Sequence, residues 1–310
     1  MRASRLVVAA CLCLMTYALT WAATSARPLV WVVLPAQEGV HAEVAEALKT
    51  EAERRRPRGI EWQSGTLTEL ERSGAAPTAI VTIGAQAWQD TARRFAREDS
   101  APILLATLLP LAAFDQERAS LARTRPTSAI VLDQPPGRHA RLARAAMPHA
   151  RRIGVLVPRG DGGRLSPLRD AFAAVGIDLG IQESTPETLA ADLVAAMSGN
   201  DALLALPAGQ IYNRQNIGML MAASYRMRVP ILGYSPSIVS AGALAGVHVT
   251  PAEIGHAGGA ALADALDGRS LPAPRAPAAF QISINPAVAR AFGLVLDAVT
   301  LERAVRADER

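Results

Sequence analysis

Short apolar runs rich in β-branched residues alternate along the chain with longer segments whose apolar residues recur at helical spacing. The short runs predict buried strands, and the longer segments predict helices that cover them. In the first half, strands are expected at 29–35, 79–84, 101–107 and 128–133, and helices at 41–55, from about residue 86, and at 138–148.

The same alternation restarts at residue 151. The strands expected there are 151–158, 177–184, 201–207 and 229–234, with helices at 166–176, 186–197 and 212–227. A less regular end follows, with a strand within 242–250, a helix from Pro251 and a Pro-rich connector at 269–278. Apolar strands separated by helices indicate parallel sheets covered on both faces. Two such successions, divided near 132–138, predict an α/β protein with two doubly wound lobes and a cleft between them.

The last predicted strand and helix lie in "ISINPAVARAFGLVL", at 282–296. Asn285 is a good N-cap, and Pro286 suits the first helical position because its missing N–H loses no helical partner. No obvious catalytic group accompanies this turn. Whether it belongs to an active site or to the scaffold depends on the rest of the chain.

The N-terminus has the layout of a secretory signal. Arg2 and Arg5 precede an apolar run at 6–23, and the small-residue stretch "AATSA" ends at residue 26. This layout predicts a signal peptide at 1–26 that is cleaved, which places the mature protein in the periplasm. An uncleaved membrane anchor is the alternative, because the apolar run approaches the length of a membrane span. A lipoprotein signal at Cys11 leaves too short an apolar run before it.

Composition limits the chemistry of the mature chain. Cys11 and Cys13 both lie in the expected signal, so the mature chain has no thiolate, disulfide or cysteine-bound metal. Only 4% of the residues are aromatic, and the net charge of +4 falls to +2 without Arg2 and Arg5. The densest basic run, "ERRRPR" at 53–58, is interpreted as a solvated helix end, with an anionic partner as the alternative. No nucleic acid partner is expected.

The sequence contains no convincing catalytic, cofactor or metal site. A P-loop needs a lysine, and the single lysine, Lys49, stands outside any such motif. No paired metal-ligand spacing links the five histidines. In "GYSPS", at 233–237, Ser237 replaces the second glycine of a nucleophile elbow, so an acyl-transfer role for Ser235 is disfavoured.

Candidate ligand contacts come from the expected strand ends, because ligands of open parallel sheets bind beyond the carboxyl ends of the strands. Tyr212 and Tyr234 are either stacking surfaces or packing residues, and Gln86 either binds the ligand or is solvated. The full candidate set is Gln37, Gly39, Gly84, Ala85, Gln86, Thr107, Arg159, Gly160, Ala208, Tyr212, Tyr234 and Ser235.

Several segments resemble the substrate-binding proteins of ABC transporters, in the tryptophan/tyrosine-binding-like branch. The segments that carry this resemblance are Asp201–Leu204, Val229–Ile231, Val239–Leu244, Gly255–Gly268 and Ile284–Leu294. The resemblance implies a type I periplasmic-binding-protein fold whose chain crosses between the lobes three times. Lobe 1 is then expected at 27–134 plus 246–275, and lobe 2 at 135–245 plus 276–310. The capped turn at 282–296 then follows the third crossing, so the resemblance implies that it is scaffold.

The resemblance also implies a function and shows two departures. It implies a monomeric, exported protein that captures a small molecule between its lobes and delivers it to a membrane permease, with a periplasmic sensory subunit as the alternative. The family often has an Asp-Pro after the third strand of lobe 1, but "TLLPLAAF" has no acid before Asp115. The aspartate that often follows the "DAL" strand is replaced by Ala208 or Gly209. An aspartate at this second place could pair with a ligand ammonium group, so its absence puts an amino-acid ligand in doubt.

Overall fold

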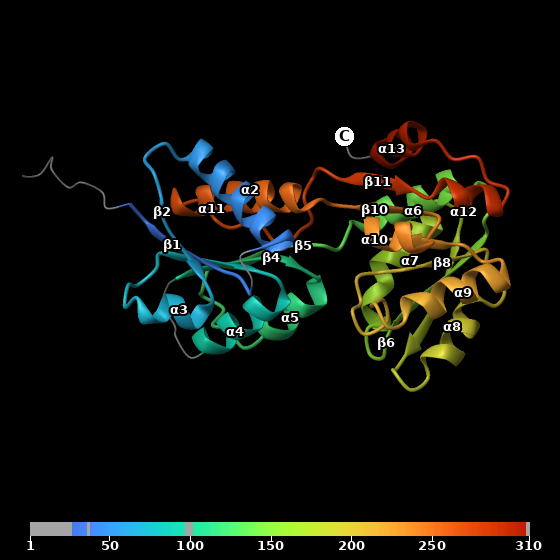
Figure 1. Cartoon of the computed structure of the whole chain (residues 1–310), viewed down its shortest axis with the longest axis horizontal. Coiled ribbons are helices and arrows are strands. Elements are labelled where there is room, and N and C mark those ends of the chain that lie inside the picture. The colour runs from blue at the N-terminus through green and yellow to red at the C-terminus, as the bar shows by residue number, and fades with distance from the viewer. Residues whose placement is uncertain (1–26, 36–37, 97–101, 308–310) are drawn as a thin grey trace, which may run out of the picture.

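The computed structural model describes residues 27–35, 38–96 and 102–307, so the expected signal at 1–26 lies outside the described residues. Two lobes lie side by side along the long axis, each with its own sheet and with helices on both faces of that sheet (Figure 1). This architecture confirms the predicted fold class. The first sheet has five strands and the second has six.

The sheet of lobe 1 is parallel throughout, in the order β2-β1-β3-β4-β5. Its strands are β1 (Leu29–Val33), β2 (Glu61–Gly65), β3 (Ala79–Ile83), β4 (Ile103–Leu109) and β5 (Thr127–Val131). Its helices are α2 (Val40–Arg55), α3 (Leu67–Arg72), α4 (Ala85–Phe95), α5 (Leu111–Arg118) and α11 (Pro251–Leu266). α2 and α11 cover one face, and α3, α4 and α5 cover the other (Figure 1).

The sheet of lobe 2 has the order β11-β10-β9-β8-β6-β7 and is parallel except between β10 and β11. Its strands are β6 (Arg152–Pro158), β7 (Asp178–Ser184), β8 (Ala202–Leu204), β9 (Ile231–Gly233), β10 (Ala245–His248) and β11 (Gln281–Ile284). Its helices are α6 (Pro136–Ala146), the 3₁₀ turn η1 (Gly162–Leu165), α7 (Ser166–Ala174), α8 (Leu189–Met197), α9 (Ile217–Met227), α10 (Pro236–Ala241), α12 (Pro286–Ala291) and α13 (Ala298–Arg306).

Three chain passages join the lobes: from β5 to α6, from β10 to α11, and from α11 to β11. β10 pairs with β9 and β11 in the second sheet. The expected boundary at residue 246 therefore falls inside a strand, and residues 246–248 belong with the second sheet. After α11 the third passage first pairs with lobe 1, because Arg275 forms an isolated parallel bridge with Ile130 of β5.

α2 and α11 lie close together because two glycines of α11, Gly255 and Gly259, face the backbone of α2. A Cβ added at Gly259 would lie 2.3 Å from the carbonyl oxygen of Leu48, and one at Gly255 would lie 2.6 Å from that of Val44. A larger residue at either position would have to push α2 away. This contact fixes α11, which follows the second passage, firmly to lobe 1.

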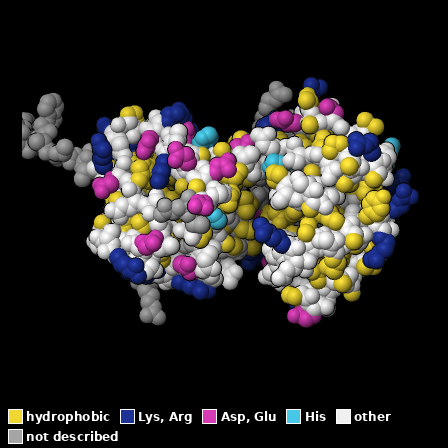
Figure 2. Space-filling view, viewed as in Figure 1, with side chains coloured by type: hydrophobic (Ala, Val, Ile, Leu, Met, Phe, Trp, Pro, Cys, Tyr) yellow, Lys and Arg dark blue, Asp and Glu magenta, His cyan; other side chains and the backbone are white. Residues whose placement is uncertain are grey.

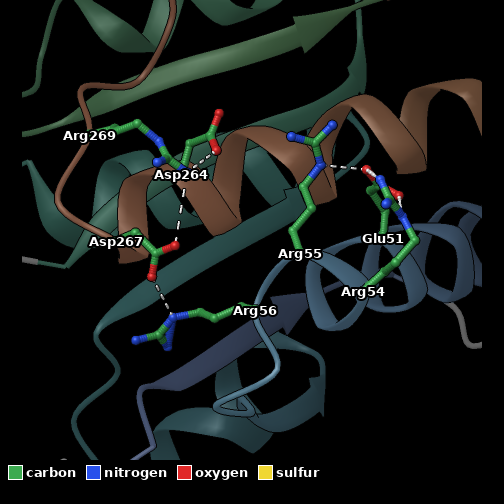
Figure 3. A network of polar contacts seen from close by, with 7 residues as sticks. All are labelled: Glu51, Arg54, Arg55, Arg56, Asp264, Asp267 and Arg269. Atoms are coloured by element: carbon green, nitrogen blue, oxygen red, sulfur yellow. Dashed lines mark hydrogen bonds and ion pairs between the residues drawn. The ribbon is translucent and has the colours of Figure 1, made fainter.

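The basic run at the end of α2 is bound within lobe 1 (Figure 3). Arg54 and Arg55 both contact Glu51, and they lower the pKa of that carboxyl to about 2. Arg56 binds Asp267, beyond the end of α11, at 3.0 Å. The run is therefore the helix end that the sequence predicted, with three of its four arginines, Arg54, Arg55 and Arg56, paired to carboxylates of the same lobe.

The third passage ends at Phe280, which contacts arginines of α6 and of the C-terminal helix α13. Phe280 is fully buried between two guanidinium groups, with Arg138 4.3 Å and Arg306 4.2 Å from the ring centroid. Arg138 also donates hydrogen bonds to the carbonyl oxygens of Pro277 and Ala278. In the capped turn, the Asn285 carboxamide oxygen accepts hydrogen bonds from two backbone N–H groups of α12. These contacts support the scaffold interpretation of that turn.

Candidate functional site

A cleft separates the two lobes, and hydrophobic side chains lie along it (Figure 2). One hollow in this cleft, which we name the hinge cavity, has a volume of about 440 Å³ and lies beside two of the three passages. Ligand pockets commonly fall in the range of about 300 to 1,000 Å³. The lining residues are Leu111, Val131, Asp133, Gln134, Pro135, Pro136, His139, Arg164, Leu165, Pro167, Leu168, Leu206, Pro207, Pro274, Arg275 and Ala276.

A second cavity of about 360 Å³ adjoins the first, and we name it the strand-end cavity. The two share six lining residues, among them Leu111, Asp133 and Arg164. The strand-end cavity adds residues at the carboxyl ends of strands and in α5, namely Ala112, Asp115, Val157, Pro158, Asp161 and Ala208. Because both lobes and the passages line these cavities, an occupant would contact both lobes at once.

Asp133 lies at the centre of this arrangement, just beyond β5. Its carboxylate accepts a hydrogen bond of 2.6 Å from the backbone N–H of Leu111, the first residue of α5. Burial raises the pKa of Asp133, the charge of Asp115 raises it further, and the Leu111 N–H acts in the opposite direction. Pro110, at the N-cap of α5, has no side chain that could cap the helix. Asp133 therefore supplies the carboxylate that the start of α5 lacks locally.

A bulge at the end of β4 directs the chain toward Asp133. Thr107 pairs with Ile130 and Leu109 pairs with Val131, so Leu108 is an extra residue in the ladder. Leu108 has a φ of 57°, a left-handed conformation that costs a non-glycine residue of the order of 1 kcal/mol or more. Bulges re-aim the chain beyond them, and here α5 begins two residues after Leu109.

His139 lines the hinge cavity from α6. Its side chain is 2% exposed, and its Nδ1 has no hydrogen-bond partner among the described residues. Burial, together with the neighbouring charge of Arg138, lowers the pKa of His139 to about 4. The imidazole is therefore neutral near pH 7.

An ion pair between described residues crosses the cleft. Arg164 of η1 lies 3.9 Å from the carboxylate of Asp115 in α5, and both side chains are about half exposed. Exposed pairs of this kind contribute between about 0 and 1 kcal/mol. The contact joins the lobes weakly.

The predicted contacts of lobe 1 lie mostly away from these cavities. Gly39 and Gly84 are the N-caps of α2 and α4, and both have positive φ. Ala85 and Gln86 are exposed at the start of α4, where the Gln86 side chain donates a hydrogen bond to Asp90. Gln37 lies outside the described residues.

Thr107 requires a correction. Its side chain is fully buried, and its hydroxyl donates to the carbonyl oxygen of Thr82 on the neighbouring strand. A threonine hydroxyl that is satisfied inside the sheet cannot reach a ligand in the cleft. Thr107 is therefore a structural residue.

Among the predicted contacts of lobe 2, Ala208 lines the strand-end cavity. Arg159 and Gly160 are exposed in the turn after β6. Tyr212 is buried, and its hydroxyl donates a hydrogen bond to the carbonyl oxygen of Leu156. The ring of Tyr234 packs edge to face against the ring of Tyr212, with the two ring centroids 6.0 Å apart. This geometry is that of packing residues.

Ser235 is the N-cap of α10. Its hydroxyl accepts a hydrogen bond from the Ile238 N–H and pairs with the hydroxyl of Ser237 at 3.1 Å. A serine that is activated for acyl transfer needs a base within hydrogen-bond reach. Neither contact of Ser235 involves a base.

The sequence interpretation missed Asp133, His139 and Arg164, which line the cavities. One signal was available for Asp133, because it is the only charged residue of "SAIVLD" and closes the strand at the expected change of lobe. His139 and Arg164 have no comparable local signal. Helix and turn geometry across the cleft decide where their side chains lie.

Two features are absent from the described residues. No group of three or more His, Cys, Asp or Glu side chains in that part of the chain could hold a metal ion. No helix among those residues is both long enough and apolar enough to cross a bilayer.

No family model and no curated protein sequence matches the chain. Solved structures do match. An ABC domain in complex with L-Trp from Streptococcus pneumonia is 14% identical with a TM-score of 0.59, and the match covers 88% of this chain and 97% of that chain. A ligand-free, open substrate binding protein with adhesive properties from Clostridium difficile is 14% identical with a TM-score of 0.64, and the match covers 87% and 96%.

A putative ribose operon repressor from Burkholderia thailandensis also matches. It is 16% identical with a TM-score of 0.51, and the match covers 83% of this chain and 99% of that chain. Identities this low establish the fold alone, and one fold serves several functions. The chain therefore has the type I periplasmic-binding-protein fold of the ABC-type substrate-binding proteins.

Proposed function

We propose that this protein is the exported solute-binding component of an ABC uptake system. It captures a small molecule in the cleft and delivers it to a membrane permease. The observation that carries the proposal is the hinge cavity, whose lining comes from lobe 1, from lobe 2 and from the passages between them. A ligand there touches both lobes, and it gains further contacts with them when the lobes close. Its binding free energy therefore favours the closed state.

The contacts of Ser235 support capture and release over acyl transfer. Its hydroxyl caps a helix and has no base as a partner. Two solved structures of the same fold are named as an ABC domain and a substrate binding protein. The signal expected at 1–26 would export the chain to the periplasm, where a monomer would meet its permease.

A thermal-shift screen of the purified protein tests this proposal. The compounds should include amines, amino acids, sugars, nucleobases and small organic acids. A ligand at about 100 times its dissociation constant should stabilise the folded state by roughly 2.7 kcal/mol. Stabilisation by one compound class, with the compound recovered unchanged, would support a binding protein. No stabilisation by any class, or conversion of the compound, would contradict it.

A further inference from the structure

We propose that Arg138 is a positioning residue for lobe closure. It couples the first passage, from β5 to α6, to the third passage, from α11 to β11, so that the two bend together when the lobes open and close. This inference deepens the proposed function, because it names a residue that guides the closure of the same two lobes. It is carried by a buried guanidinium group whose hydrogen bonds reach both passages.

Arg138 lies in the first turn of α6, directly after the first passage, and only 3% of the residue is exposed. Its guanidinium group donates a hydrogen bond of 2.9 Å to the side-chain oxygen of Gln134 in the first passage. The same group donates hydrogen bonds of 3.1 and 2.8 Å to the carbonyl oxygens of Pro277 and Ala278 in the third passage. Separating either passage from Arg138 would leave buried polar groups unsatisfied, so these contacts hold both passages in one geometry.

Aromatic packing extends the coupling to the end of the third passage. The ring of Phe280 is fully buried between the guanidinium groups of Arg138 and Arg306, and the quadrupole of the ring attracts both cations. Arg306 also donates a hydrogen bond of 3.1 Å to the carbonyl oxygen of Phe280. The segment 277–280 is therefore bound to α6 and α13, which are both helices of lobe 2.

Lobe 1 holds both passages from the other side. In the first passage, the carboxylate of Asp133 accepts the N–H of Leu111 at 2.6 Å. In the third passage, the backbone of Arg275 pairs with β5, where its N–H donates to Ala129 and its carbonyl oxygen accepts from Val131. Each passage therefore has one end fixed to lobe 1 and the other end fixed to lobe 2.

These contacts narrow each passage to one site of bending. The first passage is bound to lobe 1 at Asp133 and to lobe 2 at Gln134, so its site is the peptide between them. The third passage changes lobes at Ala276, between the bridge to β5 and the hydrogen bonds from Arg138. In the second passage, Val249 alone lies between β10 and the N-cap of α11. Because Arg138 binds the lobe 2 side of the first and third sites, it ties their bending together.

Arg138 acts at a distance from the ligand. It lines neither of the two cavities, although Gln134 and His139 beside it line the hinge cavity. Its effect on binding would therefore come through the relative positions of the lobes. A purely structural arginine would contribute to the stability of lobe 2 without changing those positions, and this difference can be measured without a ligand.

The distance between the lobes in the ligand-free protein tests the inference. Spin labels are attached through Glu46→Cys on α2 and Ala222→Cys on α9, because both residues are exposed and lie in different lobes. The background carries Cys11→Ser and Cys13→Ser, which removes the two natural cysteines of the chain. Pulsed electron paramagnetic resonance then gives the distribution of interlobe distances.

The variant that tests the coupling is Arg138→Met, and its matched control is Arg144→Met. Arg144 also lies on α6, and its guanidinium group also donates three hydrogen bonds, to the carbonyl oxygens of Pro148, Val175 and Gly176. All three partners belong to lobe 2 and lie outside the passages. Both variants should lower the melting temperature, because each of them removes three hydrogen bonds.

We expect Arg138→Met to broaden the distribution of interlobe distances, and Arg144→Met to leave it at the width of the wild type. Gln134→Ala removes only one end of the coupling and should broaden the distribution less; it takes the place of Arg138→Met if that variant does not fold. A distribution of wild-type width in the coupling variant, or equal broadening in Arg144→Met, would overturn the inference and leave the proposed function standing. If the thermal-shift screen finds no ligand, the proposed function fails, and the coupling measured without a ligand still stands.

Discussion

Two aspartates near α5 face the cleft in contrasting states. Asp133 lies at the start of the helix, partly buried, with a raised pKa and with a backbone N–H as its partner. Asp115 lies one turn along the helix, about half exposed, and pairs with Arg164 of the other lobe. Water and an arginine already stabilise the charge of Asp115. Asp133 is more buried and has no arginine partner among the described residues, so its charge has more to gain from a ligand.

The contrast separates two ways of joining the lobes. The pair of Arg164 and Asp115 needs no ligand, but solvent and salt weaken it. A ligand between Asp133 and the apolar wall would be shielded from solvent on closure. The pair of Arg164 and Asp115 therefore joins the lobes only weakly. A ligand bound beside Asp133 would supply the free energy that closes them.

The largest expected effect is on ligand affinity when each charge is removed. Asp133→Asn should weaken binding of a ligand in the hinge cavity by about 2 kcal/mol or more, roughly thirtyfold, because a buried charge in the wall contributes more to binding than an exposed one. Asp115→Asn should change the affinity less than about fivefold, because its carboxylate is exposed. Titration calorimetry of both variants checks the difference. Equal losses would remove the distinction between the two aspartates.

The pH dependence of binding should sharpen the same contrast. A ligand that donates a hydrogen bond to Asp133 binds the charged carboxylate more tightly, so the affinity should fall as the pH drops through the raised pKa of that group. His139, with a pKa of about 4, stays neutral over most of this range. Asp115→Asn should move the midpoint to lower pH, because it removes a like charge that raises the pKa of Asp133. A midpoint unchanged in Asp115→Asn would contradict this account.

A smaller effect is expected on the stability of the ligand-free protein. A carboxyl whose pKa is raised in the folded state contributes most stability at low pH, and that contribution is lost as the pH rises through the raised pKa. The melting temperature of Asp133→Asn should therefore rise relative to the wild type between about pH 4 and about pH 8. Melting curves across that range, with Asp161→Asn as the control, measure the difference. If Asp133→Asn became less stable relative to the wild type at higher pH, the charged form of Asp133 would be stabilised in the ligand-free protein.

The smallest effect should come from Arg164→Ala. Loss of its pair with Asp115 should change ligand affinity by no more than about 1 kcal/mol, and the change should shrink between about 0.05 M and about 0.5 M salt. Affinity measurements at the two salt concentrations test this. A large loss that persists at high salt would instead assign Arg164 a direct contact with the ligand.

Most of the fold was predictable from the sequence, because buried strands such as β1, β3 and β6 are nearly continuous apolar runs. β2 was missed, since it is an edge strand whose residues are mostly polar and partly exposed. The helices α3, α5, α10 and α13 were also missed. β11 was expected as a strand, but its antiparallel pairing depends on the third passage, which returns the chain to lobe 2 from lobe 1.

The cavity lining was much less predictable. Of the strand-end candidates, Ala208 lines one of the two cavities, whereas Gly39, Gly84 and Ser235 occupy helix N-caps. A strand end looks the same in sequence whether its loop faces the cleft or caps the following helix. The passages place Asp133 and His139 in the cleft, and that placement depends on the packing of two lobes, which no local pattern contains.

The most direct test is a crystal structure of the protein with a compound that the thermal-shift screen identifies. The account predicts closed lobes, with the ligand in the hinge cavity and a donor atom of the ligand within about 3.2 Å of the Asp133 carboxylate. A ligand bound elsewhere, for example beside Gln86 and Tyr234, or a ligand in the cavity that makes no contact with Asp133, would contradict it.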